Sequence, residues 1–330
     1  MNPLLEVRDL RITTTGPHGV DLVRDLSFDV AAGELLAVVG ESGAGKSVTA
    51  RAVVGLPPAG TRVSGEVRFD GEDLLGAPEA VYRRLWGRRL AFVPQDALSV
   101  LSPVHTIGDQ LALAIRSVRG VGRRAALEQA VAALDRVGIP DAARRARAYP
   151  HEFSGGMRQR AVIALATVND PDLLVADEPT TALDPTVQAR VLDLLDGFRE
   201  RAGMAVVLVT HDLAVAAARA DRVLVVYAGR HVESGPAHRV LREPRAPYTA
   251  GLVASLPARH STTRYLPVLP GTPDAPPTGC PFAPRCPAAS DVCARHEPEP
   301  TEWRDGHRAS CHRLAELPPR TADLFEGITA

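Results

Sequence analysis

The chain has 330 residues, of which 45% are hydrophobic, so it is long enough for one large core or for two unequal domains. Its formal net charge of -1 gives no basic excess that would favour nucleic acid and no acidic excess that would favour cationic partners. The N-terminus carries acids where a secretory signal has a basic start, and no apolar run approaches the about 18 residues of a membrane span. The sequence therefore predicts a folded cytoplasmic protein without a nucleic-acid partner.

Two kinds of apolar pattern predict two kinds of strand. Alternating apolar and polar side chains, typical of half-buried strands, occur in residues 4–15, 22–30 and 65–70. Short apolar runs without alternation, typical of parallel strands buried on both faces, occur in residues 35–39, 173–176 and 205–209. We therefore predict the α/β class, with a mixed core and an N-terminal antiparallel β layer.

Two changes of composition divide the rest of the chain. Between about residues 96 and 152 the sequence is rich in Ala, Leu and Arg at helical spacing, which predicts a helical subdomain inserted into the core. After residue 256 it becomes Pro-rich with little periodicity. We therefore predict a large domain of residues 1–256 and a small module of residues 257–330.

A phosphate-binding loop is predicted between a buried strand and a helix. Residues 40–47 read GESGAGKS in the context that this motif, called Walker A, requires. Its glycines let backbone amides turn towards an anion, the lysine reaches the β and γ phosphates, and the serine hydroxyl ligates Mg²⁺. Lys46 is the only lysine of the chain, which fits a position where a planar guanidinium cannot replace a compact ammonium. The predicted nucleotide contacts are Gly40, Ser42, Gly43, Ala44, Gly45, Lys46, Ser47 and Val48.

Two adjacent carboxylates end another predicted buried strand. Leu173 begins the sequence LLVADE, in which Asp177 and Glu178 are the acids. Given a phosphate loop, Asp177 is suited to hold Mg²⁺ through water and Glu178 to polarise the water that attacks the γ-phosphate. Taken alone, the pair also fits a solvated turn after a core strand.

Three further features are ambiguous when each is considered separately. The sequence FSGGMRQR places two glycines before a helix, so amides of Ser154, Gly155 and Gly156 are free to meet a second anion, although an ordinary helix start has the same pattern. His211 follows a predicted strand, where a structural hydrogen-bonding role is the commoner one. Gln95, in the sequence FVPQD, is equally open to a structural role.

Together and in this order, these motifs resemble those of ABC ATPases: the phosphate loop, Gln95, SGG, LLVADE, the sequence TALD from Thr181 to Asp184, and His211. The resemblance covers nearly the whole chain. The sequences SGGMRQRAVIALA, ADEPTTALDPTVQA, APYTAGLVASLP and GCPFAPRCP are similar to those of the ATP-binding subunits of dipeptide and oligopeptide importers. Nickel-import ATPases remain an alternative, as does a non-transport ABC ATPase of a soluble complex, although the latter has no need of the C-terminal tail.

The resemblance implies the fold of the ABC ATPases within the P-loop NTPases, with residues 1–256 as the ATPase domain and residues 257–330 as an oligopeptide-transporter-type module. It implies ATP and Mg²⁺ as cofactors. It also implies a head-to-tail dimer in which ATP lies between the phosphate loop of one subunit and the SGG helix of the other, with Ser154, Gly155 and Gly156 at the nucleotide. The chain is thus expected to be an ATPase that needs two copies of its fold.

The resemblance also assigns roles to single residues. Catalytic roles fall to Glu178 as the base, to His211 at the γ-phosphate and to Gln95, which senses the metal and the attacking water. Mg²⁺ is expected on Ser47, Gln95 and Asp177. Asp184 is expected to communicate across the dimer and is counted among the nucleotide-binding residues.

The family further implies partners and a place in the cell. The partners are a second ABC ATPase, homologous or identical, two membrane permease subunits and an extracytoplasmic substrate-binding protein. The chain would be peripheral, on the cytoplasmic face of the cell membrane. Family members often stack an aromatic residue on adenine, but residues 17–24 contain no Phe, Tyr or Trp, which leaves His18 or Val20 for that position.

All four cysteines lie near the C-terminus, in a Pro-rich segment that is unsuited to form a core unaided. They are Cys280, Cys286, Cys293 and Cys311. A zinc site usually has a pair of cysteines two residues apart, which is absent, whereas four thiolates at looser spacing suit an iron-sulfur cluster. We therefore predict an iron-sulfur cluster with a structural role, with zinc or unliganded or redox-paired thiols as the alternatives.

Overall fold

The computed structural model describes residues 3–17, 19–96, 99–181, 183–256, 267–272, 275–276, 278–325 and 328. The chain divides into two compact units. The first combines Met1–Leu5, Val30–Glu34 and Phe69–Val209, and the second combines Glu6–Asp29, Leu35–Arg68 and Thr210–Ala330. Both units contain residues of the predicted site.

Three parallel strands form the core of the first unit: β6 (Leu90–Val93), β7 (Leu173–Asp177) and β8 (Ala205–Thr210). β7 lies between the other two, with Leu173 opposite Leu90 on one side and Ala205 on the other. Every residue of β7 and β8 is buried, as expected of strands covered on both faces. This confirms the two strands predicted from unbroken apolar runs.

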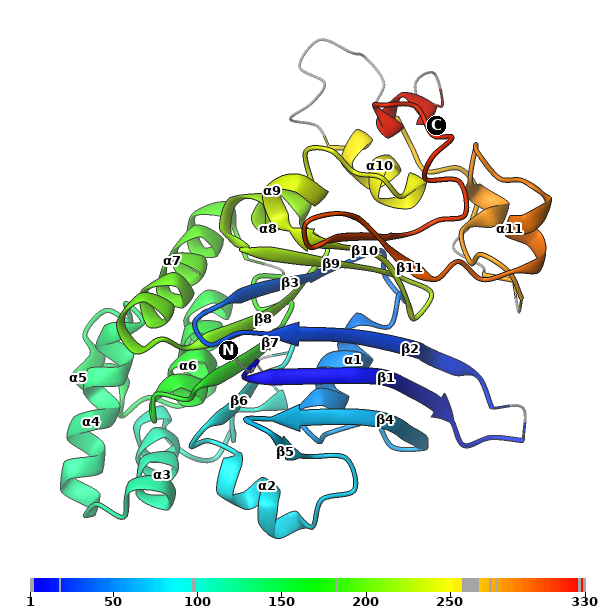
Figure 1. Ribbon diagram of the computed structural model, residues 1–330. Helices are drawn as coiled ribbons and strands as arrows, with labels where there is room; N and C mark the ends of the chain where they lie inside the picture. Colours follow the sequence, from blue (N-terminus) through cyan, green and yellow to red (C-terminus); the bar gives the residue numbers. More distant parts are fainter. Residues whose placement is uncertain are drawn as a thin grey trace. The chain divides into compact units, whose positions relative to one another are not determined.

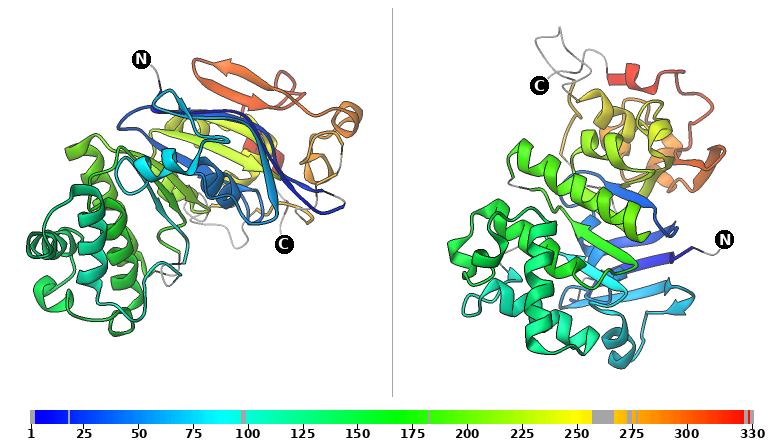
Figure 2. Two further views of the ribbon diagram at one scale, coloured as in Figure 1. Left: turned by 90° about the horizontal axis from the view of Figure 1, so that it is seen from below. Right: turned by 90° about the vertical axis from the view of Figure 1, so that its left-hand side faces the viewer.

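Helices make up most of the rest of the first unit. Among the described residues they are α2 (Glu79–Leu85), α3 (Ile107–Arg119), α4 (Arg123–Arg136), α5 (Ala142–Arg145), the 3₁₀ helix η2 (Pro150–Glu152), α6 (Gly155–Thr167) and α7 (Pro185–Ala202). The unit also contains the two-residue strand β5 (Glu72–Asp73). α3, α4 and α6 pack on one another (Figure 2). The buried side chains of α4 recur at helical spacing, at Ala126, Ala130 and Ala133, and form its packed face. The helices expected in the segment 96–152 are therefore present, and the first of them begins at Ile107.

The second unit contains the three strands of the predicted N-terminal layer. β1 (Leu5–Thr14), β2 (Asp21–Val30) and β4 (Thr61–Phe69) lie in the order β2-β1-β4. Burial alternates along β1 and β2, which is the pattern that predicted them. β4 begins four residues before the predicted segment 65–70 because its first residues are exposed or only half-buried and carry little apolar signal.

A second group of strands in this unit carries the phosphate loop. β3 (Leu35–Val39) pairs in parallel with β9 (Arg222–Tyr227), and the antiparallel strands β10 (Arg230–Pro236), β12 (His307–Ser310) and β11 (Pro300–Arg304) continue the sheet in that order (Figure 1). The C-terminal region, for which the sequence shows little periodicity, thus adds two strands to the sheet. The division into residues 1–256 and 257–330 remains a prediction, and residues 257–266 lie outside the described part of the chain.

The helices of the second unit are α1 (Lys46–Val53), α8 (Leu213–Arg219), α9 (Ala237–Val240), α10 (Pro247–Ala254), η4 (Ala283–Arg285), α11 (Asp291–Arg295) and η5 (Thr321–Phe325). α10 packs against η5, where Phe325 is fully buried and Gly251 leaves room for its ring. Within the described ranges, no helix has both the length and the apolar character that crossing a bilayer demands.

Candidate functional site

The predicted phosphate loop connects the buried strand β3 to α1, as its motif requires. Lys46 is the first residue of α1, and the residue is only 5% exposed. Its Nζ donates to the backbone oxygens of Gly40 and Glu41, both at 2.8 Å. The ammonium is therefore held over the loop by carbonyl groups, and a bound phosphate offers it oxygens of higher charge.

Two glycines of this loop are required by its backbone. Gly40 has φ +155°, and a Cβ there would lie 2.2 Å from the backbone oxygen of Val226 on β9. Gly45, with φ +92°, is the N-cap of α1, and a Cβ there would lie 2.8 Å from the backbone oxygen of Leu22. Both positions combine a left-handed backbone with close contact to neighbouring strands, so only glycine fits without movement of the chain. The N-terminus of α1, which directly follows Gly45, carries the positive end of the helix dipole and so favours an anion.

In the first unit, the end of β7 brings Glu178 close to Gln95. Asp177 is buried, and Glu178 follows it with φ +46°, a left-handed conformation that is uncommon for a residue with a side chain. The Glu178 amide donates to the backbone oxygen of Val209 on β8 at 3.0 Å. This hydrogen bond holds the strained backbone of Glu178 against β8. The Glu178 carboxylate accepts from Gln95 Nε2 at 3.2 Å and from the Thr181 hydroxyl at 2.8 Å.

The contact from Thr181 is one that the sequence did not assign. Thr181 lies three residues after Glu178, within the sequence TALD, and its hydroxyl orients the same carboxylate oxygen that Gln95 contacts. The sequence could have indicated this contact only through the spacing, since Thr181 lies three residues after the acid that follows β7. Ala182, the next residue, lies outside the described part of the chain.

The SGG sequence forms a capped helix N-terminus in the first unit. Ser154 is the N-cap of α6, and its Oγ accepts from the amide of Met157 at 3.3 Å. Gly155 is exposed and has open space around its Cα, whereas a Cβ on Gly156 would lie 3.0 Å from Val187 of α7. The two glycines thus differ: the first keeps the helix end open, and the second allows α7 to pack closely.

Asp184 and His211 both lie at the start of helices. Asp184 is the N-cap of α7 and accepts from the amides of Thr186 and Val187, both at 3.0 Å. This contact gives Asp184 a structural role that the sequence did not predict. His211 is exposed and directly precedes Asp212, the N-cap of α8. Its predicted contact with a γ-phosphate stays a prediction.

The sequence left His18 or Val20 for the position that packs on adenine, and the structure describes only one of the two. Val20 is 59% exposed, so its side chain is accessible to a base. His18 lies outside the residues that the structure describes.

The four cysteines converge on one small cavity of about 40 Å³ in the second unit. All four are free thiols. The segment is folded tightly around them, since the Cys280 amide donates to the Cys293 oxygen at 2.7 Å. Burial raises the pKa of Cys280 to about 11 and that of Cys286 to about 12, so in this form of the protein both groups are protonated thiols.

These thiols are not arranged as metal ligands. Among the described residues, no group of three or more His, Cys, Asp or Glu side chains has the geometry of a metal site. The four thiols expected to bind an iron-sulfur cluster therefore surround one cavity, but in this structure they are not placed at the positions that cluster ligands require.

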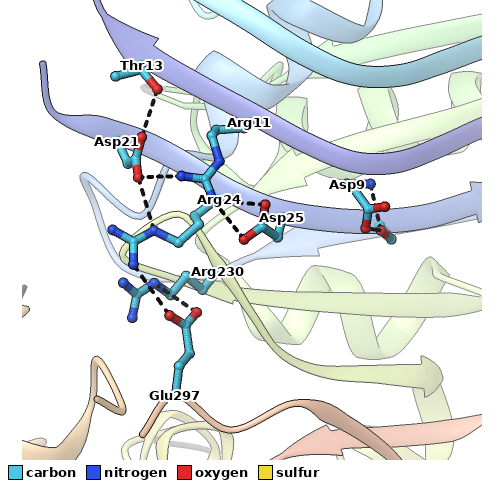
Figure 3. Close-up of polar contacts among 9 residues, drawn as sticks. Asp9, Arg11, Thr13, Asp21, Arg24, Asp25, Arg230 and Glu297 are labelled. Atoms are coloured by element: carbon cyan, nitrogen blue, oxygen red, sulfur yellow. Dashed lines mark hydrogen bonds and ion pairs between the residues drawn. The ribbon is translucent and has the colours of Figure 1, made fainter. Parts of the chain in front are cut away.

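Two residues that line the thiol cavity, Arg230 and Glu297, belong to a polar network that Figure 3 shows. Arg230 Nε forms an ion pair with Glu297 at 3.0 Å, and Arg24 of β2 reaches the same carboxylate at 3.5 Å. Arg24 also contacts Asp21 at 3.0 Å. Burial alone would raise the pKa of Asp21, but the Thr13 hydroxyl and neighbouring guanidinium groups outweigh it and lower that pKa. The network joins β2 to the cysteine-bearing segment.

Two family profiles match separate parts of the sequence. The profile of the ABC transporter family matches residues 23–181. The profile of the oligopeptide/dipeptide transporter C-terminal region matches residues 232–293, which include three of the four cysteines.

Several characterised proteins are similar over nearly the whole chain. The oligopeptide transport ATP-binding protein OppD of Salmonella typhimurium is 42% identical over 319 residues, which cover 96% of this chain and 95% of that protein. The dipeptide transport ATP-binding protein DppD of Bacillus subtilis is 43% identical over 317 residues, which cover 94% of this chain and 95% of that protein. OppD of Mycobacterium tuberculosis is 49% identical over 336 residues, but the chain spans only 54% of its length.

Solved structures show the same fold. The ATP-binding cassette MJ0796, in a dimeric post-hydrolysis state with ADP and phosphate, superposes with a TM-score of 0.64 at 25% identity, over 71% of this chain and 99% of that one. The protein cbiO1 of Clostridium perfringens superposes with a TM-score of 0.62 at 24% identity, over 78% of this chain and 98% of that one.

Proposed function

We propose that this chain, which belongs to the family of ATP-binding proteins of oligopeptide and dipeptide ABC transporters, hydrolyses ATP to drive the import of short peptides. The observation that carries the ATPase activity is the arrangement at the end of β7, where the Glu178 carboxylate is oriented by Gln95 and Thr181. A carboxylate held in this way by two donors is suited to orient one water molecule for in-line attack.

Each predicted site residue then has a role on the nucleotide. The amides between Gly40 and Val48 receive the phosphates, and Lys46 neutralises the charge that develops on the β and γ oxygens. Ser47, Gln95 and Asp177 would hold Mg²⁺, which would neutralise charge on the phosphates. His211 stabilises the γ-phosphate.

The second half of the site belongs to another subunit. The exposed N-terminus of α6, at Ser154, Gly155 and Gly156, has the free amides and the positive dipole end that favour an anion. We propose that it meets the γ-phosphate on a partner's phosphate loop, and that Asp184 communicates across the same interface. The solved dimer of MJ0796 with ADP and phosphate supports a dimer as the active form.

Replacing Glu178 with Gln tests the catalytic assignment. Gln keeps the shape and the contact with Thr181 but cannot accept the proton of the attacking water, so steady-state ATP hydrolysis should fall by at least about 100-fold while ATP binding persists. Radiolabelled phosphate release and equilibrium ATP binding measure the two quantities. Exposed Glu128 on α4, changed to Gln, is the matched control and should keep wild-type turnover. Hydrolysis at the wild-type rate in E178Q would remove Glu178 from its role.

The transport assignment is supported by the C-terminal profile and by the names of the relatives, which favour peptides over nickel. We propose that the chain works on the cytoplasmic face of the cell membrane. Its partners there are two permease subunits and a second ABC ATPase, related or identical, with an extracytoplasmic substrate-binding protein on the other side.

We also propose that Cys280, Cys286, Cys293 and Cys311 hold an iron-sulfur cluster with a structural role. Support comes from the convergence of four thiols on one cavity and from the softness of this all-sulfur ligand set. Closing the ligands around a cluster requires rearrangement and deprotonation of the thiols, which a bound cation promotes. Anaerobic purification with iron and acid-labile sulfide analysis should find both elements, and a colourless, iron-free, folded protein would contradict the cluster.

A further inference from the structure

The buried Arg285 and the half-buried Glu41 form an ion pair that joins the cysteine-bearing segment to the phosphate loop. Arg285 ends η4, directly before Cys286, and is 5% exposed. Its Nη1 donates to Glu41 Oε2 at 2.6 Å and its Nη2 donates to Glu41 Oε1 at 3.1 Å. Glu41 is the second residue of the loop GESGAGKS. Two parallel contacts of this kind are the strongest and most directional form of an arginine–carboxylate pair.

The guanidinium of Arg285 is fixed on every side by the second unit. The Arg285 Nε donates to the backbone oxygen of Pro270 at 2.7 Å, and Nη1 donates to the Tyr227 hydroxyl at 3.2 Å. The guanidinium carbon lies 5.7 Å from the ring centres of both Tyr227 and Phe282. The hydrogen bond that Arg285 donates to Glu41 outweighs burial and raises the pKa of Arg285 above its usual range. Arg285 therefore stays charged and has little freedom to leave Glu41.

Glu41 is held through its backbone as well as its side chain. Its amide donates to the Tyr248 hydroxyl at 2.9 Å, and its carbonyl accepts from Lys46 Nζ at 2.8 Å. Tyr248 lies in α10, packs against Phe282 at 5.3 Å between ring centres, and lines the thiol cavity. The turn that begins the phosphate loop is therefore anchored by residues of the C-terminal part of the chain.

The charge of Glu41 makes this anchor relevant to ATP. A carboxylate in a loop that receives phosphates repels them, and the repulsion is strong where the surroundings are partly buried and of low dielectric. Arg285 cancels that charge and fixes the direction of the carboxylate. If Arg285 is lost, an uncompensated anion remains beside the phosphate site.

We propose that Arg285 is a positioning residue for ATP binding, which neutralises Glu41, holds the start of the phosphate loop and thereby couples the cysteine-bearing segment to the nucleotide. This inference rests on the proposed role of the phosphate loop in ATP binding. It assigns Arg285 no contact with the nucleotide.

The test is equilibrium binding of Mg·ATP to the full chain carrying R285M, E41Q or both substitutions. R285M should weaken ATP binding by about tenfold or more, because the carboxylate is left uncompensated. E41Q alone should weaken binding by less than about threefold, since a cation near the site does not oppose phosphates. The double variant E41Q/R285M should return to within about threefold of the wild type, because no unpaired anion remains. Rescue by a second substitution is a result that simple loss of packing does not produce.

Two further variants separate the possible outcomes. Arg230 is buried to a similar extent as Arg285 and also pairs with a carboxylate, that of Glu297. It also donates to the backbone oxygen of Gly279 at 3.2 Å. R230M is therefore the matched control and should bind ATP as the wild type does. K46A should lose ATP binding, and if it does not, the proposed phosphate site itself is wrong. If K46A fails to bind while R285M binds normally, or if the double variant is as weak as R285M, the role of Arg285 is overturned.

R285K provides the measurement if R285M does not fold. Lysine keeps the charge but makes a single-point contact, so ATP binding should weaken by only about two- to fivefold. Thermal unfolding of each variant, followed by circular dichroism, confirms which of them are folded. Binding by R285K that is weakened as much as by K46A would contradict a role limited to charge and position.

Discussion

At the scale of single residues, His231 on β10 links the stability of the second unit to pH. Its Nδ1 lies 2.8 Å from the Ser310 hydroxyl and its Nε2 lies 2.9 Å from the Ser234 hydroxyl. Burial, with a smaller contribution from the charge of Arg308, lowers the pKa of His231 from 6.5 to about 4. The folded protein therefore keeps the imidazole neutral where the unfolded chain binds a proton.

The sign of the pH dependence follows from this difference. Above pH 6.5 the group is neutral in both states, and as the pH falls towards 4 the unfolded state gains a proton that the folded state does not accept. The free energy of unfolding should therefore decrease by about 2 kcal/mol between pH 7.5 and pH 5 on account of His231. Urea unfolding at both pH values measures it. H231Q should lose most of this decrease, whereas H238Q, at an exposed position, should retain it; equal decreases in both variants would contradict the assignment.

The residues of the nucleotide site differ in how far the sequence could predict them. Lys46, Ser47 and Glu178 belong to local motifs, in which a strand, a loop and a helix start within a few residues fix the chemistry. The pair of Arg285 and Glu41 could not be predicted in this way, because 244 residues separate its members. Only the fold brings them together, and neither residue type at its position points to the other.

At the scale of elements, the buried strands were predicted well because burial on both faces leaves no choice of side chain. β3 and β7 contain only buried residues, and their apolar runs match their bounds to within one residue. β10 and β12 were not predicted, since they lack an unbroken apolar run and their pairing includes charged residues such as Glu233 and Arg308. A register irregularity between His231 and Glu233 further breaks the alternation on which prediction depends.

Helix starts show how one feature serves both structure and function. Ser154 and Asp184 were singled out as nucleotide and dimer residues, and both are also N-caps that accept backbone amides. A cap satisfies amides that the helix cannot pair and so fixes the direction of the helix end. The sequence singled out both positions for a functional role and could not reveal the capping role, because Ser and Asp are favoured for either one; the functional role stays a prediction.

At the scale of the whole molecule, the C-terminal region is integrated with the phosphate loop of the same unit. β12 pairs with β10, Tyr248 contacts the loop backbone, and Arg285 holds the loop carboxylate. The sequence predicted an appended module from its proline content and cysteines, and composition alone could not reveal these contacts.

Binding is reciprocal, so if Arg285 affects ATP, then ATP must stabilise the segment that carries Arg285. Hydrogen exchange followed by mass spectrometry on the full chain measures this directly. Saturating Mg·ATP should slow the exchange of the amides of η4 and Cys286 by about threefold or more, because a filled loop fixes Glu41 and with it Arg285. The β11–β12 hairpin, from Pro300 to Ser310, supplies none of the contacts described above that hold Glu41, and it serves as the internal control. E41Q/R285M, which is expected to bind ATP, should lose the slowing at η4, and equal slowing in the wild type and the double variant would show that the coupling runs by another route.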